Sequence, residues 1–222
     1  MTDPSILFCT PCYGGMVTSA HFCSCLNLKE ELTRVGLAHD WLIGTNESLV
    51  TRARNEMTAS FLTTKHSHMF WLDADIEFTP ADVAAIWNLE ADIGVGVYAM
   101  KVRDKQWFAA WKDGELVKDL DQFNGPIEVQ YAGTGFMCIR REVIEKLAAS
   151  APSYEGGRSL LDHKGGVSPG NRVAAIYMTP IHNDGFESED YHFSRIAREA
   201  GFKIVMDPSV RLGHWGQFRY GA

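Results

Sequence analysis

Four short apolar runs mark the first half of the chain, and stretches with helix signals lie between them. The runs cover residues 5–10, 38–44, 68–74 and 92–99. Runs of this length, bounded by glycine and polar residues, are typical of buried strands. Gly36 is placed to end the first helical stretch, and Thr79 with Pro80 is placed to begin the third. This alternation predicts an α/β fold with a mostly parallel central sheet and helices on both faces.

The second helical stretch has the clearest periodicity. Its apolar side chains recur at every fourth position, at Leu49, Ala53, Met57 and Phe61. The spacing predicts a helix over 47–64 that buries this stripe, with Asn46 as its N-cap. Arg52 and Asn55 are three residues apart and share one face of that helix, whereas we expect Arg54 to point elsewhere, toward solvent.

The second half of the chain is less regular and predicts a smaller sheet of mixed strands beside the first. Residues 152–172 carry five glycines and two prolines without a clear period, which predicts a long loop. A last helix is expected over 187–200, followed at 203–216 by a strand, a turn and a second strand. At 222 residues the chain is expected to form one domain.

Composition narrows the classes of function. The net charge of −7 argues against a general polyanion binder, although a local basic groove would not show in this figure. No apolar stretch approaches the ~20 residues that span a bilayer, and the first residues lack a secretion signal, so we expect a cytoplasmic protein. The five cysteines are expected to be reduced thiols, with a zinc site as the alternative.

Two carboxylates, Asp73 and Asp75, follow the third apolar run with one alanine between them. In an open parallel sheet, ligands bind at the carboxyl ends of the strands. Carboxylates this close repel each other unless a cation lies between them. Mg²⁺ and Mn²⁺ prefer oxygen ligands and often complete their shell with substrate phosphates. The motif therefore predicts a metal–diphosphate site, and the alternative is a capping carboxylate beside a solvated one.

Several stretches together carry a family resemblance. They are LFCTPCYGG, SLVTRARNEMTASFL, FWLDADIEFTP, YAGTGFMCIRREVIEKL and ESEDYHFSRIAREAGFKIVMDPSVRLGHWG. In this order and spacing they resemble the nucleotide-sugar glycosyltransferases of the GT-A fold, in particular the small soluble viral and bacterial members, which would place a viral protein in the host cytoplasm. The resemblance implies a single GT-A domain, with a nucleotide-binding half over about 1–100 and an acceptor and catalytic half over about 101–222.

The resemblance also implies a role for each matching residue. Nucleotide-sugar binding falls to Thr10, Pro11, Tyr13, Arg52, Asn55, Asp73, Ala74, Gly133, Thr134 and Gly135. Tyr13 would stack on the base and Arg52 would pair with a phosphate. Asn55 would hold a loop or the nucleotide. The glycines on either side of Thr134 would let the backbone approach the donor sugar.

The metal and catalytic positions follow from the same resemblance. Asp73, Asp75 and His214 would bind the metal, and a histidine among carboxylates suits Mn²⁺, with Mg²⁺ as the other choice. Glu189 would face the sugar, and Asp190 would be the general base if the reaction inverts. The alternative is that both acids only interact favourably with the partial positive charge at the N-terminus of a helix.

The implied activity is transfer of a sugar from a UDP- or GDP-sugar to an acceptor hydroxyl. The acceptor would be a glycan, a protein or a modified nucleobase. A non-catalytic nucleotide- or carbohydrate-binding module remains an alternative, as does a phosphatase with a D-x-D nucleophile. A sugar nucleotidyltransferase would need a glycine-rich Arg/Lys signature after the first strand, which this sequence lacks.

Overall fold

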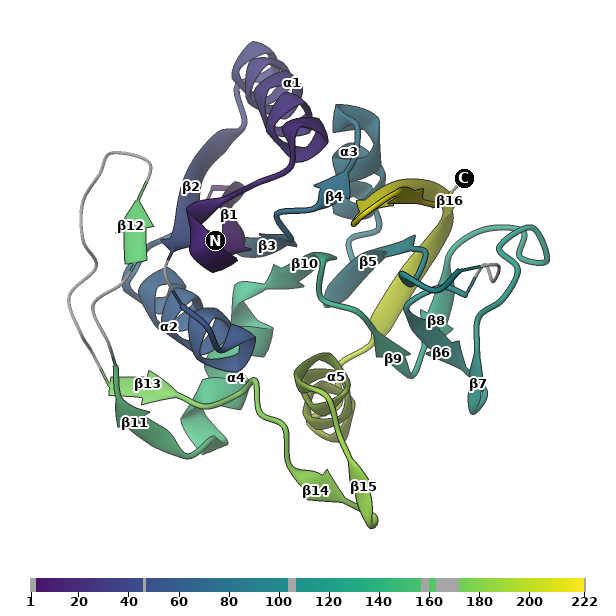
Figure 1. Cartoon of the computed structure of the whole chain (residues 1–222). Coiled ribbons are helices and arrows are strands. Elements are labelled where there is room, and N and C mark those ends of the chain that lie inside the picture. Colours follow the sequence, from purple (N-terminus) through teal and green to yellow (C-terminus); the bar gives the residue numbers. More distant parts are fainter. Residues whose placement is uncertain (1–2, 46, 104–106, 157–159, 163–171, 222) are drawn as a thin grey trace.

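The structure is a computed structural model that describes residues 3–45, 47–103, 107–156, 160–162 and 172–221 (Figure 1). Its centre is a ten-stranded sheet whose main path runs β12-β2-β1-β3-β10-β5-β16-β17, with β4 and β8 paired to β16. The strands are β1 (Ser5–Cys12), β2 (Ala38–Thr45), β3 (His68–Leu72), β4 (Ile76–Glu77), β5 (Ile93–Tyr98), β8 (Ile127–Val129), β10 (Phe136–Arg140), β12 (Leu160–Asp162), β16 (Ile204–Trp215) and β17 (Arg219–Tyr220).

The predicted α/β class is confirmed, but the sheet is mixed rather than mostly parallel. β1 pairs in parallel with β2 and β3, and β5 pairs in parallel with β16. Between these two groups lies β10, which is antiparallel to both β3 and β5. The first four residues of β10 are all buried, and an apolar run of this kind gives no sign of its direction.

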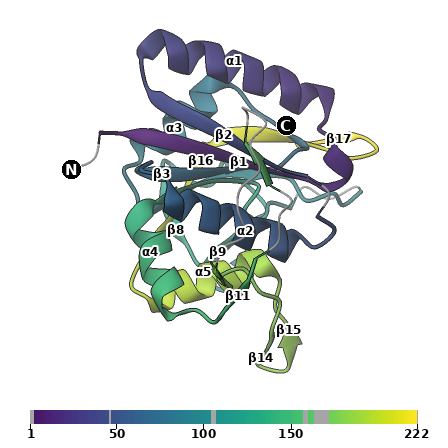
Figure 2. The same cartoon turned by 90° about the vertical axis from the view of Figure 1, so that its left-hand side faces the viewer.

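In the described residues, five α-helices cover the two faces of the sheet (Figure 2). They are α1 (Ser19–Val35), α2 (Val50–Thr63), α3 (Pro80–Asn88), α4 (Arg141–Ser150) and α5 (Glu189–Glu199). Alternate residues of β1 belong to the hydrophobic cores on opposite faces of the sheet. Ile6 and Phe8 pack in the core with α1 and α3. Leu7 and Cys9 pack in the core with α2, α4 and α5. None of the helices in the described residues is long and apolar enough to cross a membrane.

The predicted helix start and stop residues are confirmed for α1 and α3, where the signal lies within a few residues. Gly36 ends α1 in the left-handed conformation, with φ 73°. Thr79 caps α3 in a capping box with Asp82, and Pro80 follows as the first helical residue. The predicted start of α2 is wrong: the helix begins at Val50 rather than at 47, and Asn46 lies outside the described residues.

The second half contains short strands, as expected. β6 (Ala110–Lys112) lies between β7 (Glu115–Leu116) and β9 (Tyr131–Ala132) in an antiparallel sheet. β14 (Ile181–His182) and β15 (Gly185–Phe186) form a hairpin before α5, which begins at Glu189 rather than at 187.

Two predictions for the second half need correction. Part of the predicted loop at 152–172 lies outside the described residues, and the rest contributes β12 and the ladder of β11 (Ser153–Glu155) with β13 (Arg172–Ala174). The expected strand, turn and strand at 203–216 is one strand, β16, with an irregularity between Asp207 and Arg211. All five cysteines are free thiols.

Candidate active site

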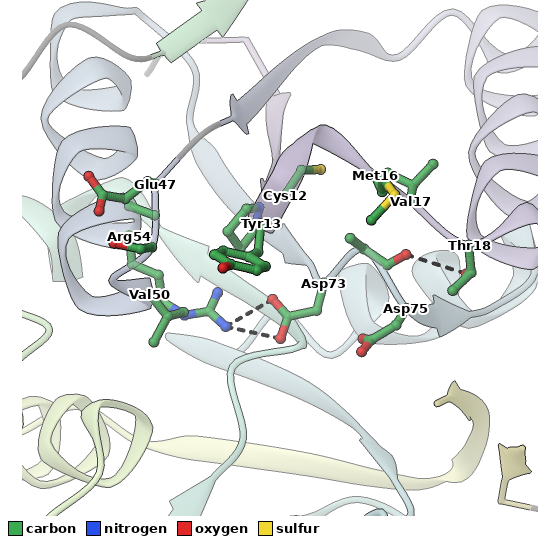
Figure 3. Close-up of a pocket in the computed structure, with 14 residues that line it drawn as sticks. Cys12, Tyr13, Met16, Val17, Thr18, Glu47, Val50, Arg54, Asp73 and Asp75 are labelled. Carbon is green, nitrogen blue, oxygen red and sulfur yellow. Dashed lines mark hydrogen bonds and ion pairs between the residues drawn. The ribbon is translucent and has the colours of Figure 1, made fainter. Parts of the chain in front are cut away.

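A cavity of about 550 Å³ opens where β1 and β3 end (Figure 3). Residues from three segments line it: 11–18 at and after the end of β1, 47–54 before and at the start of α2, and 73–75 after β3. The side chain of Tyr13 is 76% exposed and stands over this space. The cavity thus occupies the edge of the sheet at which the sequence predicts a ligand.

The loop after β3 is tied to the start of α1. The Ala74 carbonyl accepts hydrogen bonds from the backbone N–H of Thr18 at 2.9 Å and from its hydroxyl at 3.3 Å. The same hydroxyl accepts from the N–H of His21 as the helix cap. Thr18 therefore fixes the turn that carries the two aspartates. Its helix-cap signal was readable from sequence, but its contact with Ala74 was not.

Arg54 is a buried cation at the floor of the cavity. Its side chain is 3% exposed, and its Nη2 donates to both carboxylate oxygens of Asp73, at 2.8 and 3.0 Å. Its Nε lies 3.7 Å from a carboxylate oxygen of Glu189. Within the described residues, Nε and Nη1 have no hydrogen-bond partner. The expectation that Arg54 faces solvent is wrong, because α2 buries more than its apolar stripe.

Arg52 and Asn55 are engaged elsewhere. Arg52 is 49% exposed and donates two hydrogen bonds to Glu47, at 2.5 and 2.7 Å, and these lower the pKa of Glu47. Glu47 also accepts from the backbone N–H of Leu49, which explains why α2 starts late. Asn55 is buried and exchanges hydrogen bonds with the backbone N–H and C=O of Tyr177. Asn55 thus holds a loop, the first of its two expected roles.

The remaining nucleotide positions divide between the cavity and the core. Pro11, Tyr13, Asp73 and Ala74 line the cavity, as expected. Thr10 is 3% exposed and lies outside the lining of this cavity. The cavity thus begins only at Pro11, near the end of β1.

Gly133 and Gly135 make room for a tyrosine. A Cβ at Gly133 would lie 2.3 Å from the Tyr98 hydroxyl, and one at Gly135 would lie 2.8 Å from it. The N–H of Gly135 donates to that hydroxyl at 3.0 Å, and its carbonyl accepts from the N–H of Asp73 at 2.9 Å. The glycines therefore let Tyr98 pack behind the D-x-D segment, a reason that the sequence did not reveal.

Gly133→Ala is expected to lower the free energy of unfolding by about 1–3 kcal/mol, because the new methyl group forces Tyr98 or the strand to shift. Urea denaturation would measure the loss. Gly185→Ala is the matched control, since its Cβ would meet only a backbone oxygen of His182 at an ordinary 3.6 Å. Equal stability of the two variants would contradict this account of the motif.

Asp75 and His214 face each other where β4, which begins directly after Asp75, pairs with β16. The Nε2 atom of His214 lies 3.7 Å from Oδ1 of Asp75. The Nδ1 atom donates to the Ala99 carbonyl at 2.8 Å, because a carbonyl oxygen can only accept. Nε2 therefore carries a free lone pair, and burial lowers the pKa of the ring and favours its neutral form.

These two residues fit a divalent metal, and Asp73 fits less directly. A carboxylate oxygen and a neutral imidazole nitrogen suit Mn²⁺. Asp73, however, is bonded to Arg54. In the described part of the chain, no three His, Cys, Asp or Glu side chains already form a metal-binding group. The expected ligand set of Asp73, Asp75 and His214 is thus not preformed, and the metal role of these residues stays a prediction.

Glu189 and Asp190 lie in the first turn of α5. Oδ1 of Asp190 accepts from the Ser188 hydroxyl and from the backbone N–H of Tyr191. Burial raises the pKa of Glu189, although Arg54 opposes this shift. Arg54 lies between Asp73 and Glu189, with its nitrogens 2.8 and 3.7 Å from their carboxylate oxygens. The first turn of α5 therefore faces the D-x-D segment.

Comparison with known proteins establishes the fold. No known family model matches the sequence, and no curated protein matches it. Among solved structures, A197 from STIV matches with a TM-score of 0.55 and 19% identity, over 95% of this chain and 85% of that one. The catalytic domain of Drosophila β1,4-galactosyltransferase 7, solved with xylobiose, matches with a TM-score of 0.51 and 10% identity, over 96% and 71%. At such identities the likeness shows the fold alone, and that fold is of the GT-A type.

Proposed function

We propose that the protein is a metal-dependent glycosyltransferase, which moves a sugar from a nucleoside-diphosphate sugar to an acceptor hydroxyl. The observation that carries the proposal is the placement of Asp75 and His214, 3.7 Å apart, at the edge of a cavity of about 550 Å³ in a GT-A fold. A galactosyltransferase domain among the structures with this fold supports a sugar transferase.

Asp75 and His214 would hold the metal, with Asp73 as the further ligand. Bound Mn²⁺ or Mg²⁺ would offset the charge that develops on the departing diphosphate. Hydrogen bonds to a liganding group orient it, and in this chain Ala99 orients His214 while Arg54 orients Asp73. Asp75 is positioned through its backbone, because its carbonyl accepts from the N–H of Trp215 at 2.8 Å.

The cavity would receive the nucleotide, which is a UDP or GDP moiety in this proposal. Tyr13 is exposed at the mouth and would stack on the base. Arg54, rather than Arg52, would donate to the diphosphate or the sugar, because the Nη1 of this cavity-lining residue has no hydrogen-bond partner in the described chain. Residues from about 1 to 100 would thus form the nucleotide-binding half of the proposed site.

The acceptor half would come from residues 101–222. Asp190 lies where α5 begins and would accept the proton of the acceptor hydroxyl if the reaction inverts. Glu189, which Arg54 links to the D-x-D segment, would contact a sugar hydroxyl. The xylobiose in the galactosyltransferase structure supports a glycan as the acceptor. Modified nucleobases and proteins remain the other acceptors to be screened.

A panel of UDP- and GDP-sugars, assayed for release of the nucleoside diphosphate with Mn²⁺ and with EDTA, tests the proposal. At least one donor should turn over, and only with the metal. Asp75→Asn and His214→Gln should each lose this turnover, since each removes one proposed ligand. Asp113→Asn changes the same charge at an exposed turn and should leave turnover intact. Binding without turnover of any donor and acceptor pair would favour the non-catalytic module instead.

A further inference from the structure

Lys101 places an ammonium group on the second aspartate of the D-x-D motif. Its Nζ lies 2.5 Å from Oδ2 of Asp75, while His214 faces Oδ1 of the same carboxylate. The stem of Lys101 packs against Gly216, where a Cβ would lie 3.3 Å from the lysine Cδ. The turn that carries Lys101 is held by a hydrogen bond from the N–H of Met100 to the Trp107 carbonyl. The lysine is therefore held at the edge of the proposed metal site.

Each aspartate of the motif has its own internal cation, and the two cations differ in freedom. Arg54, on Asp73, is 3% exposed and enclosed by the fold. Lys101, on Asp75, is 36% exposed, and a lysine stem can swing to solvent. A divalent ion that binds Asp75 must compete with the Lys101 ammonium group, which already contacts this carboxylate. The cation that can leave is Lys101, because Arg54 is buried.

We infer that Lys101 is a built-in competitor for the divalent ion: it neutralises Asp75 in the metal-free protein and must be displaced before the metal binds. The inference rests on the proposed metal-dependent function. It makes Lys101 a residue that sets the affinity of the site for metal, and it explains how two neighbouring carboxylates coexist without an ion between them. The site then binds the free metal more weakly than its ligands alone would allow.

The test is direct binding of Mn²⁺, measured by calorimetry and by the spin-resonance signal of the free ion, without nucleotide. Lys101→Met keeps the stem and removes the charge, and it should tighten Mn²⁺ binding by about tenfold, the order expected when one positive charge within a few ångström of a divalent ion is lost. Lys101→Arg keeps the charge and should bind Mn²⁺ within about twofold of the unchanged protein. Lys112→Met, at a lysine–aspartate pair of similar lysine exposure, should change nothing.

A second measurement shows whether the effect passes through Asp75. In an Asp75→Asn background, Lys101→Met should no longer tighten binding, because the carboxylate over which the two cations compete is gone. Mn²⁺ should also raise the melting temperature of Lys101→Met at lower concentrations than it does for the unchanged protein.

Equal or weaker Mn²⁺ binding by Lys101→Met would overturn the inference and leave the proposed function standing. Absence of Mn²⁺ binding in every variant would overturn the inference together with the metal dependence. Turnover of a nucleotide sugar is measured separately, so a failure of the glycosyltransferase proposal would show in that assay while the competition for Mn²⁺ persisted.

Discussion

Asp190→Asn is expected to reduce turnover by about 10²–10⁴-fold with little change in nucleotide affinity, because general-base catalysis contributes about that much. The substitution suits the structure. Oδ1 of Asp190 accepts from the Ser188 hydroxyl and the Tyr191 N–H, and the amide oxygen of asparagine can accept both. The start of α5 should therefore survive while the proton acceptor is lost. The measurements are kcat and KM for the donor, together with the melting temperature.

Ser188→Ala is the matched control for this experiment. It removes the hydroxyl that donates to Asp190 but leaves the carboxylate, so it should cost about 0.5–1.5 kcal/mol of stability, the net contribution of one hydrogen bond, without the large fall in turnover. Glu189→Gln should have an intermediate effect, as expected of a contact to a sugar hydroxyl. A stable and fully active Asp190→Asn enzyme would remove Asp190 from the mechanism and leave it the role of a helix-end carboxylate.

Arg54→Met is expected to lower the free energy of unfolding by about 3–5 kcal/mol, the range for removing one partner of a buried ion pair. The loss arises because Asp73 and Glu189, 28% and 17% exposed, would then lack this cation. Arg34→Met is the control. Arg34 and its partner Glu31 are 68% and 40% exposed, so removing that cation should cost far less stability. Urea denaturation would compare them.

The destabilisation by Arg54→Met should grow as the pH rises. Arg54 lowers the pKa of Glu189, which burial raises, so removing Arg54 raises that pKa further. An acid whose folded-state pKa is raised costs nothing below its unfolded pKa, near 4.3. The cost appears as the pH rises from there to the folded-state pKa. Unfolding at pH 5 and pH 8 would measure this slope, and losses as small as those of Arg34→Met at both values would contradict the role of Arg54.

The two arginines of α2 show how far the sequence leads. Apolar periodicity predicts the buried stripe but not its width, so it places Arg54 in solvent. The ligand role of Arg52 came from the family resemblance. The buried face of α2 includes Arg54 and Asn55. Their partners are Asp73, which follows β3, and the backbone of Tyr177. A polar residue can be buried when a distant segment of the chain supplies its hydrogen-bond partner. The local sequence pattern does not reveal such a partner.

In other parts of the site, too, local features were predictable and contacts between distant segments were not. The D-x-D pair and the cap of α3 were predictable, because their signals lie within a few residues of one another. The approach of His214 to Asp75 was expected from family resemblance and not from periodicity. The contact of Lys101 with Asp75 was not predictable, because it depends on the course of the turn after β5.

The position of β10 between β3 and β5 affects how the chain folds during translation. β3 and β5 belong to the first half of the sequence, yet the strand that joins them is synthesised only after residue 135. Until then a growing chain exposes the inner edges of both strands, and such edges invite pairing with other chains. The donor half should therefore complete its sheet late during translation, through contacts between distant segments, which form slowly. A chain cut at residue 100 would retain both open edges.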